Sequence, residues 1–287
     1  MALYHRLQHL KLSEEDMCFF GFPLSHWQIG KARLPNPENE YSIITRPDRR
    51  ICRRCKTAYR VDHFGRSVSP ELCGYHWGKL STKSVPFYYC CRGPVSSEPC
   101  CIAPQHVSDE IDPKKLDGFI KTNLNSNFNK ESVYALDCEM VFTTGGMDVA
   151  AITVVDSNCQ VVYETLVLPD APILDYTTQH SGLIEQQFLG VTTRLRDVHM
   201  QLLTLVGKNT ILVGHGLNHD LLRLKVVHDH VVDTSVLYPH PRGLPFRSSL
   251  IFLKNRYLGR GPKIDTVLKC RGDAQATMQL ARLKCFT

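Results

Sequence analysis

The segment that most constrains the fold is VYALDCEMV, residues 133–141, an apolar run that contains two acids, Asp137 and Glu139. Its β-branched and aromatic residues predict a buried strand. Side chains two positions apart on a strand point to the same face, so the two carboxylates should share one buried surface. There they repel each other and lose hydration unless a cation neutralises them. The segment predicts a divalent metal site or, alternatively, a strand end whose acids pair with Arg or Lys.

Two further acids could complete such a site. Asp220, in GHGLNHDL, follows a short buried strand at the strand-to-helix turn, where open α/β sheets place ligands. Asp273 lies early in the helix predicted to close the sequence. Carboxylate oxygens suit Mg²⁺ or Mn²⁺, and four carboxylates can bind two such ions. Two ions of this kind are suited to the hydrolysis of phosphodiesters.

The second half of the chain alternates β-branched runs with helical patterns. The predicted strands are 133–141, 148–156, 160–168, 210–214 and 231–237. The predicted helices are 192–206, 217–227, 248–259 and 273–284. Strands first and helix–strand alternation later favour an α/β fold, a mixed sheet flanked by helices.

Cysteines mark a different unit in the first half, because seven of the twelve fall between Cys52 and Cys101. The N-terminus has no apolar leader and no run of eighteen apolar residues occurs, so we expect neither a secretory signal nor a membrane span. In a reducing compartment, cysteines and histidines at such spacings typically bind metal. The candidate ligands are Cys52, Cys55, Cys73, His76, Cys90, Cys91, Cys101 and His106.

Paired CxxC and CxxH motifs fit tetrahedral Zn²⁺ in one or two closed, structural sites. The segment CCIAPQH offers Cys101 or Cys100 together with His106. The alternative is a set of reduced, buried thiols without metal. The order of the motifs also resembles the CHORD zinc-binding pattern, in which eight ligands hold two zinc ions. This resemblance implies Cys101 as the ligand, because its spacing to His106 matches the pattern.

The net charge of +6 arises entirely from residues 1–130, and residues 46–92 hold 11 basic side chains against 3 acidic ones. Such a patch could attract nucleic-acid phosphates, or could be only a solvated basic face. Aromatic residues lie among these charges and could stack on bases or form the module's own core. They are Tyr59, Tyr75, Trp77, Phe87 and Tyr88.

These features divide the chain into four parts. We expect an N-terminal extension at 1–45, a zinc-binding module at 46–110, a linker at 111–130 and an α/β domain at 131–287.

The motifs ALDCEM, TVVD and VVDTS, with GHGLNHDL, HSGLIE and GLPFRSSL, resemble DEDD-type 3′–5′ exonucleases, and most closely the RNA exonuclease 1 family. The resemblance spans nearly all of 131–287 and extends into the cysteine-rich segment. It implies a ribonuclease H-like fold with a five-stranded mixed sheet, and a nuclear enzyme that hydrolyses RNA from a single-stranded 3′ end. It also implies metal ligands at Asp137, Glu139, Asp220 and Asp273, and substrate contacts at Met140, His180 and Ser181.

The sequence departs from this family where the general base is expected. Leu268 stands where one subclass has a histidine, and Lys269 stands where the other has a tyrosine. His219 or Cys270 could substitute, while Asp233 is expected to support the fold. Because a general base contributes about 10²- to 10⁴-fold, we expect a slow exonuclease. The alternatives are an inactive nucleic-acid-binding pseudoexonuclease and a zinc-dependent interaction protein.

Overall fold

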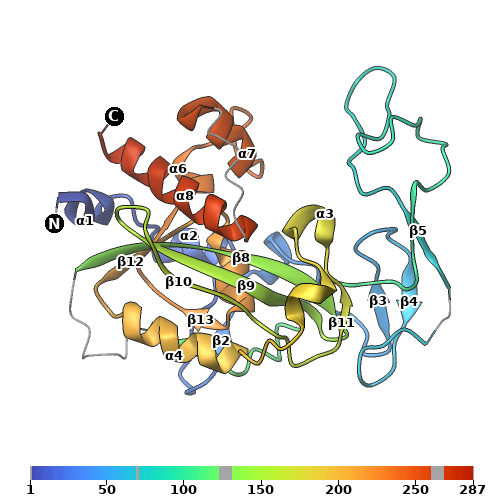
Figure 1. Ribbon diagram of the computed structural model, residues 1–287, viewed down its shortest axis with the longest axis horizontal. Helices are drawn as coiled ribbons and strands as arrows, with labels where there is room; N and C mark the ends of the chain where they lie inside the picture. The colour runs from blue at the N-terminus through green and yellow to red at the C-terminus, as the bar shows by residue number, and fades with distance from the viewer. Residues whose placement is uncertain (1, 69–70, 123–130, 260–267, 287) are drawn as a thin grey trace.

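A computed structural model describes residues 2–68, 71–122, 131–259 and 268–286. Its centre is a mixed sheet with the strand order β10-β9-β8-β12-β14, and β11 pairs with the end of β8. The β10, β9 and β8 strands are antiparallel, whereas β8, β12 and β14 are parallel. The predicted α/β fold, a mixed sheet flanked by helices, is thereby confirmed, with β11 as an additional short strand (Figure 1).

The strands of this sheet are β8 (Ser132–Thr143), β9 (Gly146–Asp156), β10 (Val161–Leu166), β11 (Ile173–Asp175), β12 (Thr210–Gly214) and β14 (Val231–Asp233). The helices around it are α1 (Ala2–Gln8), α2 (Glu14–Phe19), α3 (Thr178–Ser181), α4 (Leu195–Leu205), α5 (Leu217–Arg223), α6 (Thr234–Leu237), α7 (Leu250–Leu253) and α8 (Lys269–Phe286). Short helical turns are η1 (Pro37–Asn39), η3 (Glu185–Phe188) and η4 (Lys254–Leu258). The remaining short strands are β1 (Leu24–Ser25), β2 (Ala32–Arg33), β3 (Arg49–Ile51), β4 (Ala58–Arg60), β5 (Cys73–Tyr75), β6 (Cys101–Ala103), β7 (Ile120–Lys121) and β13 (Val226–Val227).

The alternation of side chains along β8 supplies both hydrophobic layers. Leu136 faces the cluster formed with α2, α4 and α5. Val133 and Ala135 face the opposite cluster, formed with α1 and α8. In Figure 1, α4 and α8 accordingly lie on opposite sides of the sheet. None of the helices in the described ranges combines the length and apolar character needed to cross a bilayer.

Residues 1–45, predicted as an extension, share the core of the α/β domain. Met17, Phe20 and Phe22 are buried in the same cluster as Leu136. The backbone N–H of Leu12 also donates to the carbonyl of Val231, 2.9 Å away. These contacts make the N-terminal segment one of the layers that cover the sheet.

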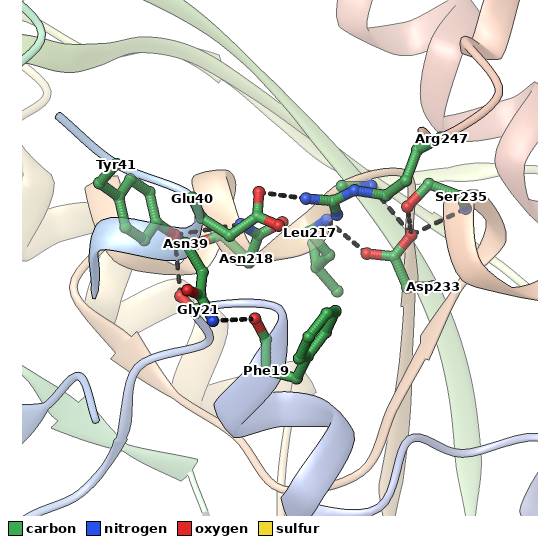
Figure 2. A network of polar contacts seen from close by, with 11 residues as sticks. Phe19, Gly21, Asn39, Glu40, Tyr41, Leu217, Asn218, Asp233, Ser235 and Arg247 are labelled. Carbon is green, nitrogen blue, oxygen red and sulfur yellow. Dashed lines mark hydrogen bonds and ion pairs between the residues drawn. The ribbon is translucent and has the colours of Figure 1, made fainter. Parts of the chain in front are cut away.

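Polar contacts fix the same segment beside α5 (Figure 2). The Tyr41 hydroxyl donates to the carbonyl of Gly21 and accepts from the amide of Asn218, at 2.9 and 3.2 Å. Glu40 forms an ion pair with Arg247, largely shielded from solvent. Asp233 accepts hydrogen bonds from Ser235 and from the backbone N–H of Leu217, so it supports the fold as expected.

Part of the predicted linker is also packed. Residues 123–130 lie outside the described residues, but β7 pairs in parallel with β13. Leu116 and Phe119 are buried in one cluster with Leu222 of α5. The described part of this segment, up to Thr122, is therefore a packed element of the domain.

Several predicted elements differ at their ends, and three of these differences affect the site. The strand predicted at 231–237 stops at Asp233, because this side chain caps α6 by accepting from the N–H of Ser235. The helix predicted at 217–227 ends at Arg223 and is followed by β13. The last helix begins at Lys269, so Asp273 lies one full turn inside it.

Candidate active site and metal clusters

Three carboxylates predicted to bind metal meet at the junction of β8 and α8. Oxygen atoms of Asp137, Glu139 and Asp273 all lie within 4.8 Å of one another. The first two point from one face of β8, and a shift in register between Glu139 and Met140 ends the regular alternation there. Helix α8 packs on this face and brings in Asp273. The spacing on the strand and the late helix thus assemble the cluster.

Asp220 lies outside this group of three but close to it. It is buried in the first turn of α5, and it is the charged neighbour that most raises the pKa of Asp137, after burial itself. Burial, followed by the charge of Asp233, raises the pKa of Asp220 to about 8. The four acids therefore form one electrostatic unit, in which three are in direct proximity.

The four acids have the properties of a cation-binding site. Burial raises the pKa of Glu139 to about 7, and this residue is only 6% exposed. Its Oε1 atom is buried and has no hydrogen-bond partner. Buried oxygens without partners are costly, and hard carboxylate ligands suit Mg²⁺ or Mn²⁺. The donor set therefore fits a divalent cation.

Two lysines border the same oxygens. Lys269 Nζ lies 3.6 Å from Glu139 Oε1 and 3.7 Å from Asp273 Oδ2. Lys254 Nζ, from η4, donates to Asp273 Oδ1 at 2.9 Å. From the sequence, Lys269 was noted only because it stands where a tyrosine base is expected, and Lys254 was not identified as a site residue. The spacing of four residues between Lys269 and Asp273 on one helix was the available signal, whereas nothing local indicates Lys254.

These pKa shifts predict a dependence of stability on pH. The folded protein holds protons on Glu139 and Asp220 that the unfolded chain releases near pH 4, so this stability is lost progressively above about pH 4 and the loss is complete at about pH 8. In zinc-replete buffer without other divalent ions, the melting temperature should still be falling between about pH 6.5 and 8. Calorimetry should show a smaller fall for Glu139→Gln. Equal slopes for both proteins would contradict the assignment.

The position of the missing base is filled by hydrophobic core. Leu268 is 5% exposed and packs with Val141, Leu183 and Phe188. Neither proposed substitute is suitable. Cys270 is fully buried, shares a hydrogen bond with Thr153, and has a pKa raised mainly by burial.

His219 is also unsuited to replace the base. It packs edge-on against the ring of Tyr41, beside the N-terminal segment. Burial lowers its pKa to about 4, and Arg247 and Arg223 add to this effect. Cys270 thus serves the packing of the core, whereas His219 lies at the surface of α5 among Tyr41 and the two arginines.

Restoring the family's histidine should therefore not restore a base. Leu268→His would place an imidazole in an apolar cluster and should cost about 2 kcal/mol or more of stability. Urea unfolding and RNA hydrolysis would measure both effects, with Leu268→Met as the volume-conserving control. A tenfold or greater gain in rate would show that the imidazole reaches the carboxylates.

The residues expected to contact substrate have different roles in the structure. His180, in α3, is exposed and lies 6.3 Å, ring centre to ring centre, from Trp77 of the cysteine-rich module. Ser181 is 2% exposed, and its hydroxyl donates to the Tyr176 carbonyl and accepts from the Leu183 N–H. Met140 offers its carbonyl to the Thr177 hydroxyl at 2.8 Å. Of these three predicted contacts, His180 is exposed, Met140 is half-buried, and Ser181 is buried and used within the turn.

The cysteine-rich module contains two clusters that could each hold a metal ion. The first is Cys52, Cys55, Cys73 and His106, and the second is His76, Cys90, Cys91 and Cys100. The sulfurs of Cys52 and Cys73 are 3.7 Å apart, and those of Cys90 and Cys100 are 3.6 Å apart. Tetrahedral zinc with Zn–S bonds of 2.3 Å separates two sulfurs by about 3.8 Å, so both clusters fit that ion.

The structure brings Cys100, and not the predicted Cys101, into the second cluster. Cys101 begins β6 and pairs with Tyr75 of β5, whereas the sulfur of Cys100 joins the second cluster. Cys100 directly precedes β6, and its sulfur lies 3.6 Å from that of Cys90. His106, whose spacing favoured Cys101, belongs to the first cluster.

A partly buried ion pair attaches the module to the sheet. Arg54, between the first two cysteines, pairs with Asp175 of β11 and lies over the rings of Tyr75 and Phe142. The other carboxylate oxygen of Asp175 accepts from the N–H of Thr177, at the start of α3. The module is thus linked directly to the segment that carries His180.

Comparisons with known proteins cover both units. The family model of the RNA exonuclease 3 middle domain matches residues 50–104. The RNA exonuclease 1 homolog of Homo sapiens is 40% identical over 276 residues, which are 90% of this chain and 22% of that protein. RNA exonuclease 3 of Schizosaccharomyces pombe is 32% identical over 97% of this chain and 49% of its own length.

RNA exonuclease 1 of Saccharomyces cerevisiae is 34% identical over 66% of this chain and 34% of that protein. Among solved structures, the catalytic unit of Neurospora crassa Pan2 matches 57% of this chain and 29% of its own, with 23% identity and a TM-score of 0.47. The chain spans less than half of the length of each of these three relatives. Through its cysteine-rich module and its acidic α/β domain together, the chain is a relative of the RNA exonuclease 1 family.

Proposed function

We propose that this protein is a slow, metal-dependent 3′–5′ exonuclease that acts on single-stranded RNA. The observation that carries the proposal is the meeting of Asp137, Glu139 and Asp273 within 4.8 Å, on a buried strand and the helix that covers it. Its relatives are named RNA exonucleases, and they match this chain across the strand, helix and cysteine-rich module.

The carboxylates would hold Mg²⁺ or Mn²⁺, which supplies activation of water and stabilisation of the leaving oxygen when bound. The residues around them position the substrate. His180 and Trp77, both exposed and adjacent, offer rings to the terminal bases. The basic module beside them would attract the phosphates. Leu268 leaves proton removal from water without a side-chain base at that position, which explains the low expected rate.

We further propose that both cysteine clusters hold structural zinc. Each offers four ligands and leaves no position for a substrate, as is typical of structural zinc sites. Zinc would then fix Trp77 and Arg54, which lie next to ligands of the two clusters in the sequence.

Hydrolysis of a 5′-labelled single-stranded RNA in Mn²⁺ tests the function. The protein should shorten the RNA slowly from its 3′ end, and Asp137→Asn should reduce the rate by about 100-fold or more. Asp170→Asn, at an acid whose side chain is 88% exposed, is the matched control and should change little. A blocked 3′ end should stop the reaction.

The alternative, an inactive RNA-binding protein, is favoured by the buried Leu268 and by the two lysines at the carboxylates. It predicts unchanged RNA binding and no hydrolysis by either the natural protein or Asp137→Asn. Hydrolysis lost only in Asp137→Asn supports the exonuclease instead.

A further inference from the structure

Of the four acids, Asp273 forms ion pairs with two lysines. Lys254 Nζ contacts its Oδ1 at 2.9 Å, and Lys269 Nζ lies 3.7 Å from its Oδ2. An oxygen that binds an ammonium group is less available to a metal ion. The acid that would complete a metal pair is therefore already neutralised from both sides.

The two lysines come from different elements, and each is held in place. Lys269 opens α8 and lies one turn before Asp273, so the two side chains share a face of the helix. Lys254 is the first residue of η4, and its hydrogen bond to Asp273 holds η4 beside the carboxylates. Their side chains are 52% and 37% exposed, so their stems reach in from the surface.

The remaining acids have fewer lysine contacts than Asp273. Glu139 Oε1 has Lys269 at 3.6 Å but no hydrogen bond. No lysine or arginine in the described ranges forms an ion pair with Asp137 or Asp220. The carboxylates without a cationic partner are thus Asp137 on the strand and Asp220 on α5.

Charge balance then decides how many ions the site accepts. Four ionised carboxylates carry four negative charges, which two divalent ions would balance. Two ammonium groups already supply half of that positive charge. Each lysine also opposes a second dication by Coulomb repulsion, an effect that is large at such short distances in a partly buried site.

From these contacts we infer that Lys254 and Lys269 replace one metal ion of the pair, so that the centre binds a single divalent cation. The inference rests on the proposed metal centre and makes it a one-ion site. Asp137, Glu139 and Asp220 would be its principal ligands, while Asp273 chiefly orients the lysines. A one-ion site would be a second cause of slow hydrolysis, independent of the missing base at Leu268.

Mn²⁺ titration of the full chain, followed by electron paramagnetic resonance in zinc-replete buffer at about pH 8, counts the ions directly. The natural protein should bind one Mn²⁺ at this centre, and Glu139→Gln should weaken it. Lys254→Gln combined with Lys269→Gln should bind two, the first about 10-fold more tightly or better. Lys284→Gln, on the same helix and about 22 Å along it, should behave like the natural protein.

The outcomes separate the inference from the proposed function. Two ions in the natural protein, or one ion of unchanged affinity in the double variant, would overturn the lysine substitution and leave the metal centre standing. No Mn²⁺ in either protein would overturn the metal centre and the inference together. One ion that becomes two supports both.

Discussion

Replacing Cys100 with serine should unfold the second half of the cysteine-rich module, whereas the same replacement at the adjacent Cys101 should leave it folded. Cys100 lies 3.6 Å from Cys90 within a four-ligand cluster, while Cys101 pairs with Tyr75 in a strand. Zinc binding to such sites is worth about 10–16 kcal/mol, and that free energy is folding free energy. This is the largest single effect we expect.

The module has little else to stabilise it. Among its described residues, a single hydrophobic cluster has four buried members, of which Cys52 and Cys73 are themselves candidate ligands. Zinc content by mass spectrometry should fall from two ions to one in Cys100→Ser and remain two in Cys101→Ser. Protease digestion should then cut the module only in the first variant. The reverse pattern would restore the ligand chosen from sequence spacing.

Replacing Arg54 with alanine should destabilise the zinc-loaded protein by about 2 kcal/mol or more, because the part-buried carboxylate of Asp175 would lose its cationic partner. The Arg54 side chain is 8% exposed and its Nη1 atom has no hydrogen bond, so the ion pair is its main polar contact. Urea unfolding measures the loss. RNA binding should weaken as well, since Asp175 also holds Thr177 at the start of α3.

The neighbouring residue provides the control. Arg53 pairs with Asp109 at 3.1 Å, but its side chain is 56% exposed. Exposed pairs contribute at most about 1 kcal/mol, so Arg53→Ala should have little effect on stability. Similar losses in both variants would mean that the general positive charge of the segment, and not the partly buried pair, stabilises the protein.

Local patterns were sufficient to predict the sheet and its acids. The period of two in VYALDCEMV placed Asp137 and Glu139 on one face, and the turn after β12 placed Asp220 beside them. These features depend on neighbouring residues, which the sequence displays directly. Long-range packing was not predictable in the same way, because Phe22 and Lys254 carry no local sign of the partners they meet.

The choice between Cys100 and Cys101 shows the same limit at a smaller scale. Spacing to His106 favoured one neighbour, but the register of β5 with β6 decides which side chain turns toward the second cluster. Register is set by pairing between residues about 26 positions apart, which a spacing pattern does not contain.

The packing of α1 against α8 has a consequence for biosynthesis. Arg6 donates to the carbonyl of Cys285 across 279 positions of sequence, and Tyr4 and Leu7 share a buried cluster with Met278. Helix α1 is synthesised long before α8, so it cannot form these contacts until α8 has left the ribosome. Contacts this distant slow folding, and the apolar face of the sheet stays open during translation. The nascent chain is therefore expected to depend on chaperones until α8 has emerged.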